Sequence, residues 1–311
     1  MFEGLIGGFY ECLQPLNLVL LFLGTFLGLL VGALPGLSSP MAIIILLPVT
    51  YSLDPLPALL VMIGVYVGTK LGGSFAAILL RTPGTPASAC TALDGFPMAE
   101  KGEAGLALGY ATYGSFVGGL SSWIIAVTFI PVISAIALKS SNADIALIGI
   151  MGLVMVSAFT RGSMLKGFIG VCVGILIGCM GMDRVDTIER FTFGSLDLLT
   201  GVPFAAALVG LFGFAVVISD LALMKSKAEI VATKFRIKLP TFKQFFSRWK
   251  AWGTGSFMGA IVGAVPGVGA DGATWLAYGT VKNNSKNPEE FGIGNPDGVI
   301  APETANNGTT G

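Results

Sequence analysis

The chain has 311 residues, of which 53% are hydrophobic and only 12% are charged, and its formal net charge is zero. Ordinary soluble domains carry about 25% charged residues, so this composition, with a mean hydropathy of +0.81, predicts a polytopic membrane protein. Because the net charge is zero, the composition does not indicate binding to nucleic acid. The sequence contains no histidine, which removes His-based acid–base catalysis and most zinc sites. We therefore predict that the protein is not an enzyme.

Apolar stretches along the chain predict an all-α fold with about seven transmembrane helices plus broken half-helices, because a spanning helix needs about 20 apolar residues. The candidate spans are 16–34, 56–80, 104–137, 143–160, 164–181, 196–223 and 253–266. The stretch 104–137 fits either one tilted helix with an extension or two short helices, with a kink at Pro131. Segments 40–51 and 272–281 are too short to span. No basic residue precedes Lys70, so no signal peptide is predicted.

A repeated segment relates the two ends of the chain. The thirteen residues Gly24–Gly36 recur as Gly255–Gly267 with eight identities, and in both copies glycine falls at every fourth position. Such glycines line one helix face and let a second backbone approach closely. Each copy ends in Pro-Gly, which breaks the helix at membrane depth. Matched breaks in two halves point to a transporter substrate site; a close-packed kink without a ligand is the alternative.

Charge patterning predicts the topology. Segment 224–250 holds eight basic residues against the single acid Glu229, so we place this loop in the cytoplasm. Aromatic residues at helical spacing over 242–252, after Thr241 as a cap, predict an interfacial helix, with a plain solvated linker as the alternative. The two repeats then enter the membrane from opposite sides, as inverted repeats do. The predicted domains are 1–223, a basic linker at 224–252, and the start of the second repeat at 253–311.

Residues around the two breaks are the first substrate-binding candidates. Broken helices free backbone N–H and C=O groups that lipid cannot satisfy, and hydroxyl or carboxylate side chains at the same level add oxygen ligands. The candidates at the breaks are Pro35, Gly36, Ser38, Ser39, Pro266, Gly267, Gly269 and Asp271.

A second group of candidates follows Lys70. Lys70 and Arg81 are the two basic residues among the first hundred positions. Arg81 is the better partner for an anionic substrate, because its guanidinium matches carboxylate geometry. Snorkelling to the headgroups is the alternative for both cations. The further candidates here are Gly72, Gly73, Ser74, Thr82, Pro83, Gly84 and Thr85.

The end of the chain, Ala301–Gly311, is rich in amide and hydroxyl oxygens, with Asn306 and Asn307 as substrate-binding candidates. Such a density suits sodium or a hydroxylated carboxylate; a polar loop is the alternative. We assign no definite metal site, and a coupling sodium ion near Asp271, Asn306 and Asn307 is an open interpretation. The Asp94-Gly95 pair is interpreted as a turn in a solvated loop.

Four segments of the chain resemble the large membrane subunit of the tripartite tricarboxylate transporters: "GLLVGALPGLSSPMAIIILLPVTYSLDP", "GGSFAAILLRTPGTPASACTALDGFPMAEKGEAG", "GAIVGAVPGVGADGATWLAYG" and "NPEEFGIGNPDGVIAPETANNGTTG". The resemblance implies a multi-pass permease of the bacterial inner membrane, working with a small membrane subunit and a periplasmic solute-binding protein. It implies uptake of carboxylates such as tricarboxylates by symport with sodium or protons, with no other cofactor. It also implies that the second repeat is truncated at its C-terminal end.

By motif match, the resemblance carries function to the loop at Pro35-Gly36, to Gly72–Ser74 and Thr82–Thr85, and to Pro266–Asp271 and Pro302–Asn307. Lys70 and the Ser38-Ser39 pair depart from the expected pattern.

Two other readings stay open. A stand-alone secondary carrier or channel is the first. An intramembrane aspartyl protease is less favoured, because Gly267-Val268-Gly269-Ala270-Asp271 has one residue more than the Gly-x-Gly-Asp motif.

Overall fold

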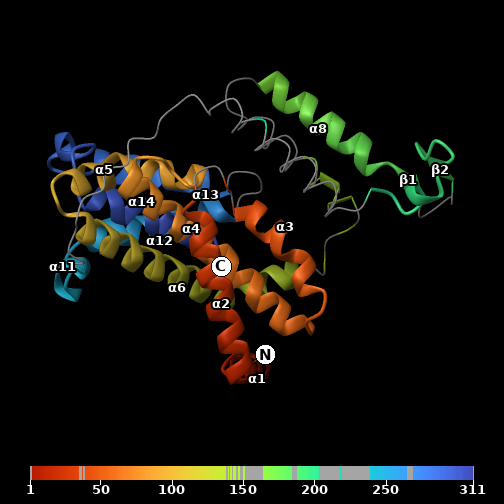
Figure 1. The fold of residues 1–311 in the computed structure, drawn as a ribbon, viewed down its shortest axis with the longest axis horizontal. Helices are drawn as coiled ribbons and strands as arrows, with labels where there is room; N and C mark the ends of the chain where they lie inside the picture. Colours follow the sequence, from red (N-terminus) through yellow and green to blue (C-terminus); the bar gives the residue numbers. More distant parts are fainter. Residues whose placement is uncertain are drawn as a thin grey trace. The chain divides into compact units, whose positions relative to one another are not determined.

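The computed structural model describes residues 2–34, 37, 39–137, 139, 141, 143–144, 146–147, 150, 164–183, 188–202, 218, 239–264 and 269–310. The described residues are mainly helical (Figure 1), in agreement with the predicted all-α class. Within these ranges the strands form one antiparallel hairpin, in which β1 (Gly181–Met182) pairs with β2 (Glu189–Arg190).

Three helices among the described residues are long and apolar enough to cross a membrane: α2 (Pro15–Gly32), α4 (Pro55–Leu80) and the Ala104–Pro131 part of α6 (Ala104–Ala137). α6 continues through Pro131 as one helix, so the alternative of two short helices over this stretch is wrong. The predicted spans at 143–160 and 196–223 fall largely outside the described residues. The number of about seven spans therefore stays a prediction.

The remaining described helices are shorter. They are α1 (Phe2–Cys12), α3 (Ser39–Thr50), α5 (Ala89–Glu100), α8 (Met164–Gly178), α11 (Phe242–Phe246), α12 (Trp249–Gly263), α13 (Gly269–Asn283) and α14 (Asp297–Gly308), with 3-10 turns η1 (Pro86–Ser88), η2 (Leu196–Leu198) and η4 (Pro288–Glu290). Proline at the first position starts both α2 and α4, where its missing N–H costs no hydrogen bond.

The chain divides into two compact units. The described residues of the first unit lie within 1–128, 218–264 and 269–311, and those of the second lie within 129–217. The described residues of both copies of the glycine repeat belong to the first unit. The second contains α8 and the β1–β2 hairpin, where Arg190 pairs with Asp183 at 2.5 Å.

Both copies of the repeat make the same kind of helix pair. In the first, α2 packs on α4, and a Cβ on Gly24 would lie 2.5 Å from the Val61 carbonyl oxygen. In the second, α12 packs on α14, and a Cβ on Gly255 would lie 2.5 Å from the Ala301 carbonyl oxygen. Gly28 and Gly32 continue the first contact at Val65 and Thr69, and Gly259 and Gly263 continue the second at Ala305 and Thr309. The predicted close approach of backbones is confirmed in both copies.

Both repeated helices are interrupted. α2 ends at Gly32 and α3 begins at Ser39, while α12 ends at Gly263 and α13 begins at Gly269. The Pro-Gly residues themselves, Pro35, Gly36, Pro266 and Gly267, and also Ser38, lie outside the described residues.

The aromatic segment after the basic loop forms two helices in place of one. Thr241 caps α11 by accepting a hydrogen bond from the Gln244 backbone N–H, as predicted, but α11 stops at Phe246 and α12 starts at Trp249. Phe245 is buried with its ring edge against Tyr113 of α6, whereas Phe242 is 70% exposed. The segment therefore anchors on the helix bundle with one face and leaves an aromatic face outside.

The junction between α11 and α12 is held to the start of α14 by an ion pair. Arg248 and Asp297 lie 2.9 Å apart, nitrogen to oxygen. Burial lowers the pKa of the Arg248 guanidinium, but the hydrogen bond and charge of Asp297, together with Tyr110, raise the pKa above its ordinary value.

Candidate functional site

A cluster of buried polar side chains lies in the first unit where helices from both ends of the chain meet. We call this cluster the polar centre; its members are Lys70 and Ser74 of α4, Thr91 of α5, Ser115 of α6, and Glu303, Asn306 and Asn307 of α14. Apolar helices bury such groups only at a cost, unless the groups are paired or functional. The concentration of polar side chains marks this position as the candidate site.

Glu303 is fully buried and joins α14 to three other helices. Its Oε1 accepts hydrogen bonds from the Ser74 hydroxyl at 2.5 Å and from the Thr91 hydroxyl, and its Oε2 accepts one from Ser115 at 3.3 Å. A buried carboxylate is tolerated when hydrogen bonds satisfy its oxygens. Glu303 lies in the Pro302–Asn307 stretch to which the resemblance carries function, whereas neither Thr91 nor Ser115 was a candidate from sequence.

Lys70 is only 3% exposed, so the snorkelling alternative is wrong for this residue. Its ammonium donates to the Asn306 backbone carbonyl and to the Thr309 hydroxyl, both at 2.7 Å. The Tyr66 ring lies 4.6 Å from the same nitrogen, within cation–π range. Lys70 therefore connects the first repeat to the C-terminal end of α14.

Asn306 and Asn307 have buried side-chain amides without hydrogen-bond partners among the described residues. Buried polar groups are nearly always hydrogen-bonded, to protein, water or ligand. Both amides can donate through Nδ2 and accept through Oδ1. The arrangement can therefore bind a solute with carboxylate and hydroxyl groups, or hold water. Residues 301–308 are helical, so the polar-loop alternative is wrong for this part of Ala301–Gly311.

The ends of the two repeated helices flank the polar centre. Gly32, the last residue of α2, packs against the backbone of Thr69, which directly precedes Lys70. Gly263, the last residue of α12, packs against Thr309, the partner of Lys70. Both helix interruptions therefore begin beside the contact between Lys70 and Thr309 in the first unit.

The residues that follow the two interruptions differ in exposure. Ser39 is buried at the start of α3, whereas Asp271 is exposed in the first turn of α13. Gly269 opens α13 with a φ of 58°, a conformation that glycine adopts without strain. Lys70 lies within electrostatic range of Asp271 and of Glu303.

The loop after α4 folds back onto the glycines of that helix. The Gly84 N–H donates to the Gly73 carbonyl at 3.2 Å, and Thr85 caps η1 with Ser88. Gly72, Gly73, Gly84 and Thr85 are buried, Thr82 is half-buried and Pro83 is exposed. Of these candidates Ser74 belongs to the polar centre, whereas Gly72 packs against Leu29 of α2 and Gly73 packs against Thr85 of the loop.

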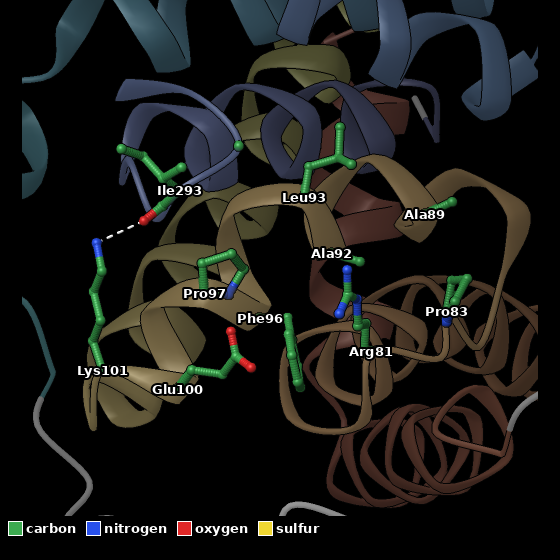
Figure 2. A pocket seen from close by; sticks show the side chains of 11 residues that line it. Arg81, Pro83, Ala89, Ala92, Leu93, Phe96, Pro97, Glu100, Lys101 and Ile293 are labelled. Atoms are coloured by element: carbon green, nitrogen blue, oxygen red, sulfur yellow. Dashed lines mark hydrogen bonds between the residues drawn. The ribbon is translucent and has the colours of Figure 1, made fainter. Parts of the chain in front are cut away.

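Arg81 lies in a different environment. It ends α4 with a φ of 57° and is exposed, with its guanidinium 5.4 Å from the Phe96 ring centre. Figure 2 shows Arg81 beside Phe96, and Lys101 donating to the Ile293 carbonyl at 2.6 Å. These residues line a pocket of about 700 Å³ that no member of the polar centre lines.

Asp94 is not in a solvated turn, contrary to our interpretation. It lies within α5, is fully buried, and its Oδ1 accepts three backbone N–H groups, from Gly292, Gly294 and Asn295 at 2.7–2.9 Å. Its Oδ2 accepts a hydrogen bond from the Tyr278 hydroxyl at 2.9 Å. Asp94 therefore fastens α5 to α13 and to the loop before α14, and so positions Thr91 one turn away.

Removing the Tyr278 hydroxyl by Tyr278→Phe should lower the free energy of unfolding by about 2 kcal/mol, because a hydrogen bond to a buried carboxylate is lost. Thermal or denaturant unfolding of the purified protein in detergent would measure this. Tyr51→Phe is the matched control, since Tyr51 is 72% exposed. Equal stabilities for the two variants would contradict the role given to Asp94.

These features define a class: a helical membrane protein in which two copies of a glycine-lined helix pair enclose a buried polar centre. The chain belongs to the tripartite tricarboxylate transporter TctA family, whose model matches residues 18–311. It is also 38% identical over 301 residues, 96% of this chain, to an Agrobacterium vitis protein described as an uncharacterized 52.8 kDa protein in the TAR-I ttuC' 3' region.

The chain spans 60% of the length of that relative. A second Agrobacterium vitis protein, described as an uncharacterized protein in the TAR-II ttuC' 3' region, is 49% identical over 49 residues, which are 16% of this chain and 20% of that protein. No solved structure matches the chain.

Proposed function

We propose that the protein is a permease subunit for ion-coupled uptake of carboxylates such as tricarboxylates, receiving solute from a periplasmic binding protein and working with a small membrane subunit. The observation that carries this proposal is the pair of buried amides at Asn306 and Asn307, which have no hydrogen-bond partner in the part of the chain that the structure describes. Membership of the TctA family supports the substrate class and the partners.

The chemistry of the polar centre suits a carboxylate. The Nδ2 groups of Asn306 and Asn307 can donate to its oxygens, while the Lys70 ammonium supplies positive charge nearby. The helices that begin beyond the interruptions, α3 and α13, add N-terminal dipoles that favour an anion. The proposed site therefore keeps the candidates at both breaks, together with Gly72, Gly73 and Ser74.

The membrane arrangement is also a proposal. We place the protein in the bacterial inner membrane with about seven spans and two inverted repeats, and with domains 1–223, 224–252 and 253–311. The matched packing of α2 on α4 and of α12 on α14 supports two repeats. The coupling ion is sodium or a proton, with sodium near Asp271, Asn306 and Asn307 as one location.

Replacing both amides, as Asn306→Ala with Asn307→Ala, should weaken carboxylate binding by about ten- to a hundredfold, because charge-assisted hydrogen bonds are lost. The stability should change little, since the amides have no partner among the described residues. Binding of labelled di- and tricarboxylates to the full-length protein, alongside thermal unfolding, would measure both effects.

Asn283→Ala is the control for that experiment, because Asn283 is exposed at the end of α13. Unchanged carboxylate affinity in the double variant would contradict the proposed site. Uptake by proteoliposomes that contain this subunit alone would support the stand-alone carrier in place of the tripartite system.

A further inference from the structure

The Lys70 ammonium lies where helix chemistry favours a bound cation. The last carbonyls of a helix have no intrahelical partner and carry partial negative charge, and such helix ends coordinate sodium in secondary transporters. At the end of α14 the Asn306 carbonyl and the Thr309 hydroxyl both point to Lys70 Nζ, each at 2.7 Å. We propose that Lys70 is a fixed cation that takes the place of a sodium ion at the end of α14, so that the protein needs no sodium there.

The Asn306 carbonyl oxygen and the Thr309 hydroxyl oxygen are already hydrogen-bonded. The Thr309 hydroxyl accepts from Lys70 and itself donates to the Asn306 carbonyl at 2.8 Å. The Tyr66 ring covers another side of the ammonium. A sodium ion at the same oxygens would have to displace the ammonium, which is tethered to α4 and nearly fully buried.

Charge leads to the same conclusion. Glu303, which is fully buried, lies within electrostatic range of Lys70, so the ammonium already provides one positive charge beside this carboxylate. A second cation about 4 Å from the ammonium would be repelled enough to weaken its affinity roughly a thousandfold at an intermediate dielectric. The residues present at this helix end therefore do not fit sodium while Lys70 is in place.

This inference rests on the proposed function, but its test does not require substrate. Binding of radioactive sodium to the purified full-length protein, without carboxylate, compares the wild type with Lys70→Ala and Lys70→Met. Both variants remove the charge, but only alanine also vacates the space beside the Asn306 and Thr309 oxygens. We expect no sodium binding at this site by the wild type or by Lys70→Met, and at least a tenfold gain by Lys70→Ala.

Lys101→Ala is the matched control, because Lys101 also donates to a backbone carbonyl, that of Ile293 at 2.6 Å, but from an exposed position. It should gain no sodium binding. A folded Lys70→Ala variant that gains none, or a wild type that binds sodium as tightly as that variant, would overturn the inference.

A second measurement covers the case in which Lys70→Ala does not fold. If Lys70 already holds the place of sodium at this helix end, the coupling ion is the proton, so carboxylate binding by the wild type should be the same, within twofold, in sodium and in choline buffers. A tenfold dependence on sodium would overturn the fixed cation. Absence of carboxylate binding in both buffers would instead contradict the proposed function, and the sodium measurement would still decide the role of Lys70.

Discussion

Glu303→Ala should lower the free energy of unfolding by about 3–5 kcal/mol, because three buried hydroxyls lose their acceptor and a cavity is left. The affected donors are Ser74, Thr91 and Ser115, which belong to three different helices. Glu303→Gln should cost less, about 1–3 kcal/mol, since the amide keeps the shape and one acceptor oxygen. Unfolding in detergent micelles, followed by thermal melting, would measure both.

Glu289→Ala is the control for these variants, because Glu289 is exposed in η4. It should unfold like the wild type. If Glu303→Ala also matched the wild type, the carboxylate could not be what holds α4, α5 and α6 to α14.

Gly255→Ala should destabilise the protein by about 3 kcal/mol. The added methyl group would lie 2.5 Å from the Ala301 carbonyl oxygen and 2.7 Å from Thr304 Cβ. Backbone cannot move aside as a flexible side chain can, so the cost should reach the upper end of what overpacking produces. α12 would then be pushed from α14, and the polar centre would widen. Denaturant unfolding together with carboxylate affinity would detect both consequences.

Gly253→Ala provides a matched comparison on the same helix, two residues away. No atom lies within 4 Å of a Cβ built on Gly253, so alanine there should be neutral or stabilise by up to about 1 kcal/mol through its helix propensity. Equal effects at positions 253 and 255 would contradict the packing of α12 on α14.

The glycine repeat was predictable because close helix approach depends on the absence of a side chain, which is a property of the residue itself. Gly24 and Gly255 occupy matching places in their helix pairs, as the repeat required. The helix interruptions were predictable for the same reason, since Pro-Gly opposes a helix in any surroundings.

Asp94 was misinterpreted because Asp-Gly is a local turn signal, and the local signal was overridden by distant partners. Its carboxylate is satisfied by backbone N–H groups from Gly292 to Asn295, about 200 positions away. Thr91 and Ser115 were missed because a lone hydroxyl in an apolar helix looks like any packing residue. The acid in the oxygen-rich end of the chain, Glu303, was the available signal for the polar centre.

The sequence by itself determined the membrane class, the family resemblance and the repeated helix pairs. Hydropathy, glycine spacing and helix breaks each depend on residues that lie close together in the chain. Only the tertiary structure decided which polar residues share one site. Lys70 reaches the Asn306 carbonyl across 236 positions, and Ser74 reaches Glu303 across 229. A cationic side chain in an apolar helix points to the membrane surface or into the protein, depending on whether a neighbouring helix provides hydrogen-bond acceptors for it. No local sequence pattern contains that information.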